Sequence, residues 1–300
     1  MPVLALLTLT FAALLAGLVV GALLNRSAFE RRIDGEVATL LAEIETLPTY
    51  YDEAELDGLP APVQRFLRRN LHEGTPHPSC LRTRESGRVR QRPGQPWTEY
   101  VGESYTVAAT PGLLCFTRQR PFPLVWVDAR TLYLRGRGYQ SAKLLSSITS
   151  IDADDEATRR AVLLDYLAEL PLIPGALLPG EDRRWQPVDE HAARIELRDG
   201  ELTVAGVFEF DELGHIVRFV SEDRPYTGPA LGEGPVRWAV DYTEQRSFAE
   251  LELPTRVAAA WLVGEARFDY LERTLEAVEH DIPRRFGSSE ARPRNDAASQ

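Results

Sequence analysis

The sequence predicts an α+β protein in which an N-terminal membrane-spanning helix precedes an antiparallel β-sheet accompanied by helices. Three observations predict it. The first 24 residues contain no charged side chain. Two stretches between Phe29 and Leu71 have apolar residues at helical spacing. From Cys80 onward, short runs rich in β-branched and aromatic residues are separated by Gly, Pro and Asp.

The segment from Met1 to Leu24 is long enough to cross a membrane, because about 20 apolar residues span the hydrocarbon core. A cleavable signal peptide, the alternative, typically has a basic start, a shorter apolar stretch and a small-residue cleavage site. None of these features is clear here, so we expect a permanent single-pass anchor in the cell membrane.

Basic residues follow the apolar segment, at Arg26, Arg31 and Arg32, and only the α-amino group precedes it. Because positive charge is enriched on the cytoplasmic side of membrane helices, this pattern favours a cytoplasmic position for the rest of the chain. An extracytoplasmic position is the alternative.

The chain has a formal net charge of −11, which argues against a nucleic-acid partner because such proteins need a basic face. It also means that membrane attachment rests on the N-terminal helix rather than on a basic surface. The two cysteines, Cys80 and Cys115, either pair or stay free.

Further helices are predicted where apolar residues share one helical face: residues 29–47, 59–71, 154–170 and 266–280. The third has Asp154 or Asp155 as N-cap, and Pro171 ends it. In the last, Phe268, Leu271, Leu275 and Val278 have helical spacing.

The predicted strands form two groups of consecutive runs. The spacing within each group is too short for crossover helices, which favours an antiparallel meander over a parallel sheet. The runs of the first group are 81–92, 97–109, 113–120, 124–130, 131–140 and 143–151, and those of the second are 193–223, 236–248 and 254–263.

No short catalytic, nucleotide-binding or metal-binding motif occurs in the sequence, so we expect no cofactor, no metal and no catalytic residue. The five histidines are scattered and are expected on the surface or in loops.

Asp165 and Glu169 lie one turn apart on a mostly apolar helix. Such a pair suits acid–base chemistry, a bound cation or structural ion pairs with nearby arginines.

Aromatic residues are spread over the predicted strands, with Trp97, Trp126, Trp185, Trp238 and Trp261 each in a different region. On a curved sheet they would line an apolar cavity, and otherwise they fill the core. Arg224 follows a strand, where it would bind an anionic head group or pair with Glu222 or Asp223.

Several runs resemble an uncharacterised bacterial family catalogued as a domain of unknown function. They are LPAPVQRFLRRNL, VWVDAR, LRGRGYQSAKLL, LLDYLAELPLIPGALLPGEDRRWQPVDEHAARIEL, VFEFDELGHIVRFVSEDRP and LPTRVAAAW. The resemblance implies a strongly curved antiparallel sheet with helices on its concave side, similar to lipoprotein-carrier half-barrels. Such carriers work outside the cytoplasm, in conflict with the arginine pattern. The recurrent positions are Tyr166, Glu169, Pro171, Trp185, Phe208, Arg224, Trp238 and Trp261, and no established role accompanies them.

We therefore predict a membrane anchor at 1–24, a helical connecting region at 25–79, a half-barrel-like domain at 80–287 and a disordered tail at 288–300. The expected function is a non-catalytic binding module for membrane lipid or another apolar ligand. The alternatives are an enzyme that uses Glu169 or Asp165 on a membrane-derived substrate, and a structural component of an envelope complex. The predicted ligand-binding residues are Trp126, Tyr166, Glu169, Trp185, Arg224, Trp238 and Trp261.

Overall fold

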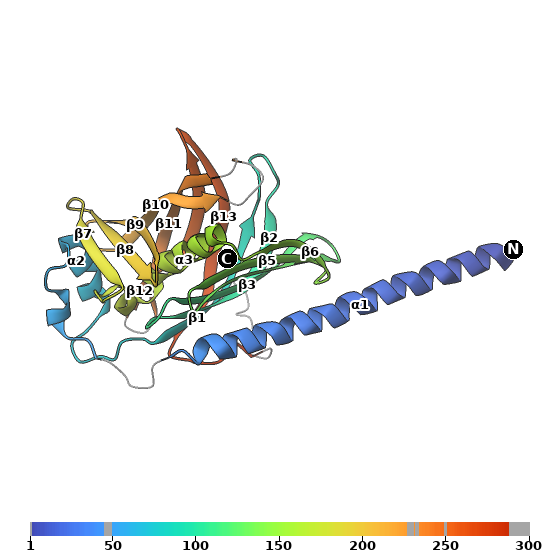
Figure 1. Cartoon of the computed structure of the whole chain (residues 1–300), viewed down its shortest axis with the longest axis horizontal. Coiled ribbons are helices and arrows are strands. Elements are labelled where there is room, and N and C mark those ends of the chain that lie inside the picture. Colours follow the sequence, from blue (N-terminus) through green and yellow to red (C-terminus); the bar gives the residue numbers. More distant parts are fainter. Residues whose placement is uncertain (1, 45–49, 227–230, 232–233, 249–250, 288–300) are drawn as a thin grey trace, which may run out of the picture.

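The computed structural model describes residues 2–44, 50–226, 231, 234–248 and 251–287. These residues form one antiparallel sheet of 13 strands that curves into a half-barrel, with helices on both faces (Figure 1). We call the face that carries helix α3 the concave face and the opposite one the outer face. The predicted fold class, a curved antiparallel sheet behind an N-terminal apolar helix, is confirmed.

The sheet consists of two meanders joined by their first and last strands. Within each meander consecutive strands pair, and β1 pairs with β13 to complete the order β6-β5-β4-β3-β2-β1-β13-β12-β11-β10-β9-β8-β7. The first meander comprises β1 (Cys80–Val89), β2 (Thr98–Val107), β3 (Gly112–Phe122), β4 (Val125–Leu134), β5 (Arg137–Leu144) and β6 (Ile148–Ala153). The second comprises β7 (Arg183–Pro187), β8 (Ala192–Asp199), β9 (Leu202–Phe210), β10 (Ile216–Tyr226), β11 (Gly234–Phe248), β12 (Leu251–Val263) and β13 (Ala266–His280).

Helix α3 (Glu156–Glu169) connects the two edge strands, β6 and β7, and therefore crosses the concave face. It contacts β4 and β5 in one meander and β9 and β10 in the other. Asp155 is the N-cap, one of the two predicted candidates, and its carboxylate accepts a hydrogen bond from the Thr158 backbone N–H. Two short 3-10 helices, η2 (Leu170–Leu172) and η3 (Pro174–Leu177), follow at the predicted stop.

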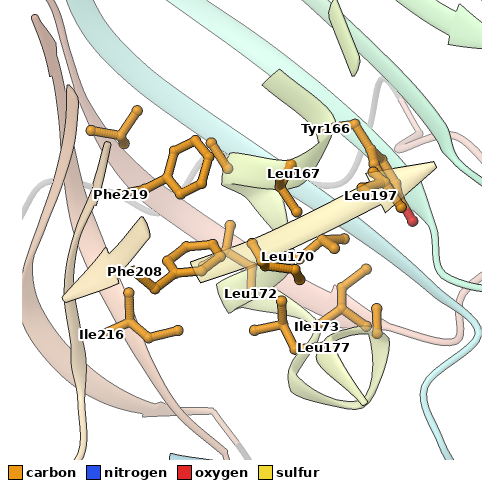
Figure 2. Packing of buried hydrophobic residues seen from close by; sticks show 14 of the residues in the cluster. Tyr166, Leu167, Leu170, Leu172, Ile173, Leu177, Leu197, Phe208, Ile216 and Phe219 are labelled. Atoms are coloured by element: carbon orange, nitrogen blue, oxygen red, sulfur yellow. The ribbon is translucent and has the colours of Figure 1, made fainter. Parts of the chain in front are cut away.

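The main hydrophobic core lies between the concave face and these helices (Figure 2). Leu167, Leu170 and Leu177 pack with sheet residues such as Phe208 and Phe219. The predicted helix at 59–71 forms α2 (Ala61–Asn70), preceded by η1 (Glu53–Leu56), and joins the same core. This packing fixes α3 over the middle of the sheet.

Helix α1 (Pro2–Leu41) is continuous, as predicted, and its two halves have different surroundings. Phe29, Ile33, Val37 and Leu40 are buried against the outer face of β2 and β3. The earlier part extends away from the sheet (Figure 1), and its large apolar side chains are exposed. Among the described residues α1 is the helix long and apolar enough to cross a membrane, which fits an anchor or a signal sequence.

The segment 266–280 is strand β13, and the prediction of a helix there is wrong. Two β-bulges explain the misleading spacing. Tyr270 is an extra residue relative to β12, because Asp269 pairs with Ala260 and Leu271 pairs with the adjacent Ala259. Glu276 is an extra residue relative to β1, because Leu275 pairs with Glu85 and Ala277 pairs with the adjacent Arg84. Each bulge moves the next residues to the other face. Phe268, Leu275 and Val278 consequently all reach the concave core at spacings that imitate a helix.

Other boundaries differ in smaller ways. The run 131–140 is not a strand of its own: its first four residues complete β4, and a turn at Arg135 and Gly136, both with positive φ, starts β5. Strand β7 was not predicted.

Cys80 and Cys115 are free, and they lie on opposite faces of the sheet. The predicted disordered tail, 288–300, lies outside the described residues, and the predicted domain boundaries stay a prediction.

Candidate functional site

A pocket of about 230 Å³ lies on the concave face, between α3 and the strands at the junction of the two meanders. Residues from both meanders line it because β1 and β13 meet there. Much of its wall is apolar. The apolar and aromatic lining residues include Leu113, Val240, Val257, Ala259, Leu271, Tyr100, Trp238 and Tyr270.

Arg273 lies between two carboxylates at one side of this pocket. Its guanidinium donates to Glu85 on β1 at 2.8 Å and to Glu169 at the end of α3. Tyr100 also donates to Glu85, at 3.1 Å. Burial raises the pKa of the Glu169 carboxyl, and the Arg273 guanidinium opposes this shift. The cluster joins β1, β13 and α3 through buried charges.

A second ion pair lies one helical turn earlier on α3. Arg224 donates to the Asp165 carboxylate at 2.7 Å. The guanidinium carbon of Arg224 is 4.4 Å from the ring centroid of Trp238 and 5.0 Å from that of Trp261, within the range of cation–π contacts. Burial raises the pKa of Asp165, and Arg224 opposes the shift. Arg224 therefore holds a fixed position at the pocket wall.

Three polar groups of the pocket have no hydrogen-bond partner in the described part of the chain. The Ser104 side chain is 3% exposed, and its hydroxyl makes no hydrogen bond there. The Nε atoms of Arg224 and Arg273 are buried and unpaired in the same way. Since buried polar groups are normally hydrogen-bonded, these three donors are exceptions in the wall of the pocket.

The structure brings together four of the residues singled out from the sequence. Asp165, Glu169, Arg224 and Trp238 line the pocket, and Trp261, which pairs with Trp238 across β11 and β12, also contacts Arg224. The pair of Arg224 with Asp165 is one of the structural ion pairs that the sequence suggests for this carboxylate, and it replaces the alternative pairing of Arg224 with Glu222 or Asp223. The antiparallel register places Arg224 over α3, which the local sequence does not indicate.

Tyr166 and Trp185 lie outside the pocket. The Tyr166 hydroxyl donates to the Val107 backbone carbonyl at 3.1 Å, inside the core. Trp185 donates to the Leu177 carbonyl at 2.8 Å and packs on Phe208. Both side chains therefore connect the concave helices to the sheet.

Trp126 is not brought to the pocket either. It lies on the outer face beside α1, where its Nε1 donates to Ser146 Oγ at 2.9 Å. Strand alternation accounts for this, because Leu132 on the same strand packs against α1 and Tyr133 faces the concave core. The expected cavity-lining position of Trp126 is wrong.

Sequence inspection missed Glu85, Ser104 and Arg273. Glu85 and Ser104 are ordinary polar residues of predicted strands, although Glu85 shares its face with the buried Leu81 and Thr83. Arg273 falls in the segment predicted as a helix. The alternation of Leu271, Arg273 and Leu275, between the two bulges, was the signal that could have placed it.

A larger hollow of about 840 Å³ lies on the outer face. Its wall includes the Arg88–Glu272 pair at 2.7 Å, whose side chains are exposed to solvent. Within the described ranges, no three His, Cys, Asp or Glu side chains are grouped to hold a metal ion. The concave pocket is the better candidate because it combines an apolar wall with buried polar groups.

The model of a family of unknown function, DUF6544, matches residues 37–273. A search of curated proteins found no match. Similar solved structures include a LolA superfamily protein from Nitrosomonas europaea, at 8% identity over 73% of this chain and 91% of that one, with a TM-score of 0.40. A DUF1329 family protein from Desulfovibrio piger has 9% identity, covers 78% of this chain and 95% of its own, and has a TM-score of 0.41.

Proposed function

Because the chain belongs to DUF6544, a family of unknown function, we propose its function from the geometry of its own residues. The protein is a membrane-attached binding module that holds an apolar or amphipathic, lipid-like ligand in the concave pocket and catalyses no reaction. Helix α1 attaches it to the membrane. The half-barrel provides the binding site.

The observation that carries this proposal is the combination of an apolar wall with unpartnered buried donors. Leu113, Val257 and Leu271 provide apolar contact, and the Ser104 hydroxyl has no hydrogen-bond partner among the described residues. The volume of about 230 Å³ is below the roughly 300–1,000 Å³ of sites for drug-sized molecules. The pocket therefore suits a single chain or the polar end of a lipid rather than a whole two-chain lipid.

Acid–base catalysis by Asp165 or Glu169 has less support. Burial raises both pKa values, as catalysis requires, but each carboxylate accepts a hydrogen bond from an arginine that is itself buried. These ion pairs account for the carboxylates as links between α3 and the sheet. A catalytic carboxylate must also lie within hydrogen-bonding distance of the proton that it transfers, and Asp165 and Glu169 each accept from an arginine instead.

The direct test is binding of three twelve-carbon probes, dodecanol, dodecanoate and dodecylamine, to the full chain in lipid nanodiscs. We expect saturable binding of dodecanol, the uncharged probe. Each charged side chain that lines the pocket already has a partner of opposite charge, so none is left to bind the charged head of dodecanoate or dodecylamine. Mass spectrometry of each probe before and after incubation measures turnover. Chemical conversion of a probe would overturn the non-catalytic part of the proposal.

Ala259→Phe fills the pocket from β12, and Ala258→Phe is its matched control because the adjacent residue faces the outer surface. We expect Ala259→Phe to abolish binding and Ala258→Phe to retain it. Cys115→Phe fills the pocket from β3 and gives a second test if Ala259→Phe does not fold. Binding that survives in a folded pocket-filling variant would contradict the proposal.

A further inference from the structure

The tip of the β3–β4 hairpin is apolar and faces solvent. Phe122 is 70% exposed and Leu124 is 93% exposed, with Pro123 between them. Leu124 has φ +66°, at the turn position where Gly or Asn is favoured. A bulky leucine here is unfavourable both for the backbone and for contact with water, so folding of the hairpin does not account for it.

The hairpin lies beside the point where the exposed apolar part of α1 ends. The guanidinium carbon of Arg26 is 5.9 Å from the Trp126 ring centroid. Asn25 donates to Ser147 Oγ in the β5–β6 turn at 2.9 Å, and Trp126 donates to Ser146 in the same turn. Figure 1 shows the ends of β5 and β6 next to α1. These contacts fix both hairpins at the level of Asn25 and Arg26.

The surroundings of the tip combine apolar and basic groups. A hollow of about 490 Å³ lies between the hairpin and α1, lined by Arg26, Arg120 and Trp126 among others. Trp at the water interface, Arg near lipid phosphates and apolar side chains beyond them are the pattern of membrane-contacting surfaces.

We propose that this surface, formed by Phe122 and Leu124 of the β3–β4 tip, contacts the same bilayer that α1 enters. Phe122 and Leu124 insert below the headgroups, and Arg26 and Arg120 face the lipid phosphates. The half-barrel is thereby held in one orientation on the membrane. This inference rests on the proposed attachment through α1 but not on the ligand pocket.

The test uses the full chain in nanodiscs of phosphatidylcholine and phosphatidylglycerol, with an environment-sensitive fluorophore on one introduced cysteine. The positions compared are Leu124→Cys at the tip, Leu14→Cys on the exposed part of α1 and Val188→Cys in the β7–β8 turn. Lipids that carry a nitroxide quencher near the headgroup report contact at Leu124→Cys and Val188→Cys, and lipids that carry it along the acyl chain report contact at Leu14→Cys. Protein without an introduced cysteine measures labelling of Cys80 and Cys115.

We expect several-fold stronger quenching at Leu124→Cys than at Val188→Cys, together with a blue-shifted emission. Quenching at Leu14→Cys without quenching at Leu124→Cys would overturn the hairpin contact and leave membrane attachment intact. Absence of quenching at both positions would overturn the attachment as well. Equal quenching at Leu124→Cys and Val188→Cys would also contradict the fixed orientation.

Discussion

Arg273 on β13 donates a hydrogen bond to Glu85 on β1 at 2.8 Å, across the strand pair that joins the two meanders. The same guanidinium binds Glu169 of α3. One buried cation therefore links three elements that are far apart in the sequence, and it forms part of the pocket wall. The stability of the half-barrel and the shape of the pocket depend on the same side chain.

Arg273→Met should reduce the free energy of unfolding by about 3–5 kcal/mol, because it leaves two buried carboxylates without their counter-charge. The loss should depend on pH. Burial already raises the pKa of Glu169, and removal of Arg273 raises it further. A carboxyl with a raised folded-state pKa contributes stability that is present below its unfolded pKa, about 4.3, and is lost as pH rises through the folded value.

The deficit of Arg273→Met should therefore be largest at neutral pH and shrink toward about pH 4.3. Chemical denaturation at several pH values measures it. Arg256→Met on β12 is the control, because Arg256 pairs with Glu244 at an exposed site, where ion pairs contribute about 0–1 kcal/mol. Equal losses in both variants would contradict the structural role of Arg273.

Gly138→Ala should separate α3 from β5. A Cβ at this position would lie 2.5 Å from the Arg159 Cα, closer than two such atoms approach. We expect a loss of stability of about 1–3 kcal/mol, as is typical for overpacking. Gly35→Ala on α1, where an added Cβ meets no atom within 4 Å, should not destabilise. A neutral Gly138→Ala would show that α3 is not packed as closely as described.

Leu124→Gly should leave the thermal stability in detergent unchanged or slightly raised. Relief of the left-handed backbone conformation gains about 1–2 kcal/mol, while the greater freedom of glycine in the unfolded chain costs about 0.5–1 kcal/mol. Leu124→Val should destabilise, because a β-branched residue fits positive φ poorly. Differential scanning fluorimetry compares the two. A marked loss in Leu124→Gly would assign the leucine a packing role.

The native cysteines should react slowly with iodoacetamide in the folded protein. Burial raises the pKa of Cys80 to about 11 and raises that of Cys115 as well, so few thiolates form near pH 8. Alkylation should stay slow as pH rises from 7 to 9 and become fast in denaturant. Val188→Cys in the β7–β8 turn provides an exposed reference thiol, and intact-mass spectrometry follows the reaction. Fast alkylation of Cys115 near pH 7 would contradict its raised pKa.

Much of the fold follows from local patterns. The apolar N-terminal helix, the Asp155 cap and the turns between short apolar runs are encoded within a few residues, and these elements are present in the structure. The helix prediction for 266–280 is wrong because of two β-bulges. The extra residues Tyr270 and Glu276 change the spacing of the buried apolar residues from that of a strand to that of a helix. Pairing with β1 and β12, not local propensity, decides the structure of that segment.

The site was harder to predict because it depends on long-range register. Asp165, Glu169, Arg224 and Trp238 were recognised by residue type, and their assembly requires that β10, β11 and α3 meet. Glu85 and Arg273 come together only where the last strand pairs with the first. The face of the sheet on which Trp126 lies could not be predicted, because the sequence of a strand does not indicate which of its faces a helix will cover.

Photo-cross-linking with a diazirine-bearing fatty alcohol tests the binding function most directly. The probe is added to membranes that contain the full chain, and peptide mass spectrometry locates the modified residues. We predict modification at pocket residues such as Cys115 and Leu271 that is lost in Ala259→Phe and retained in Ala258→Phe. Modification confined to α1 and the outer face, or unchanged in folded Ala259→Phe, would contradict a ligand site on the concave face.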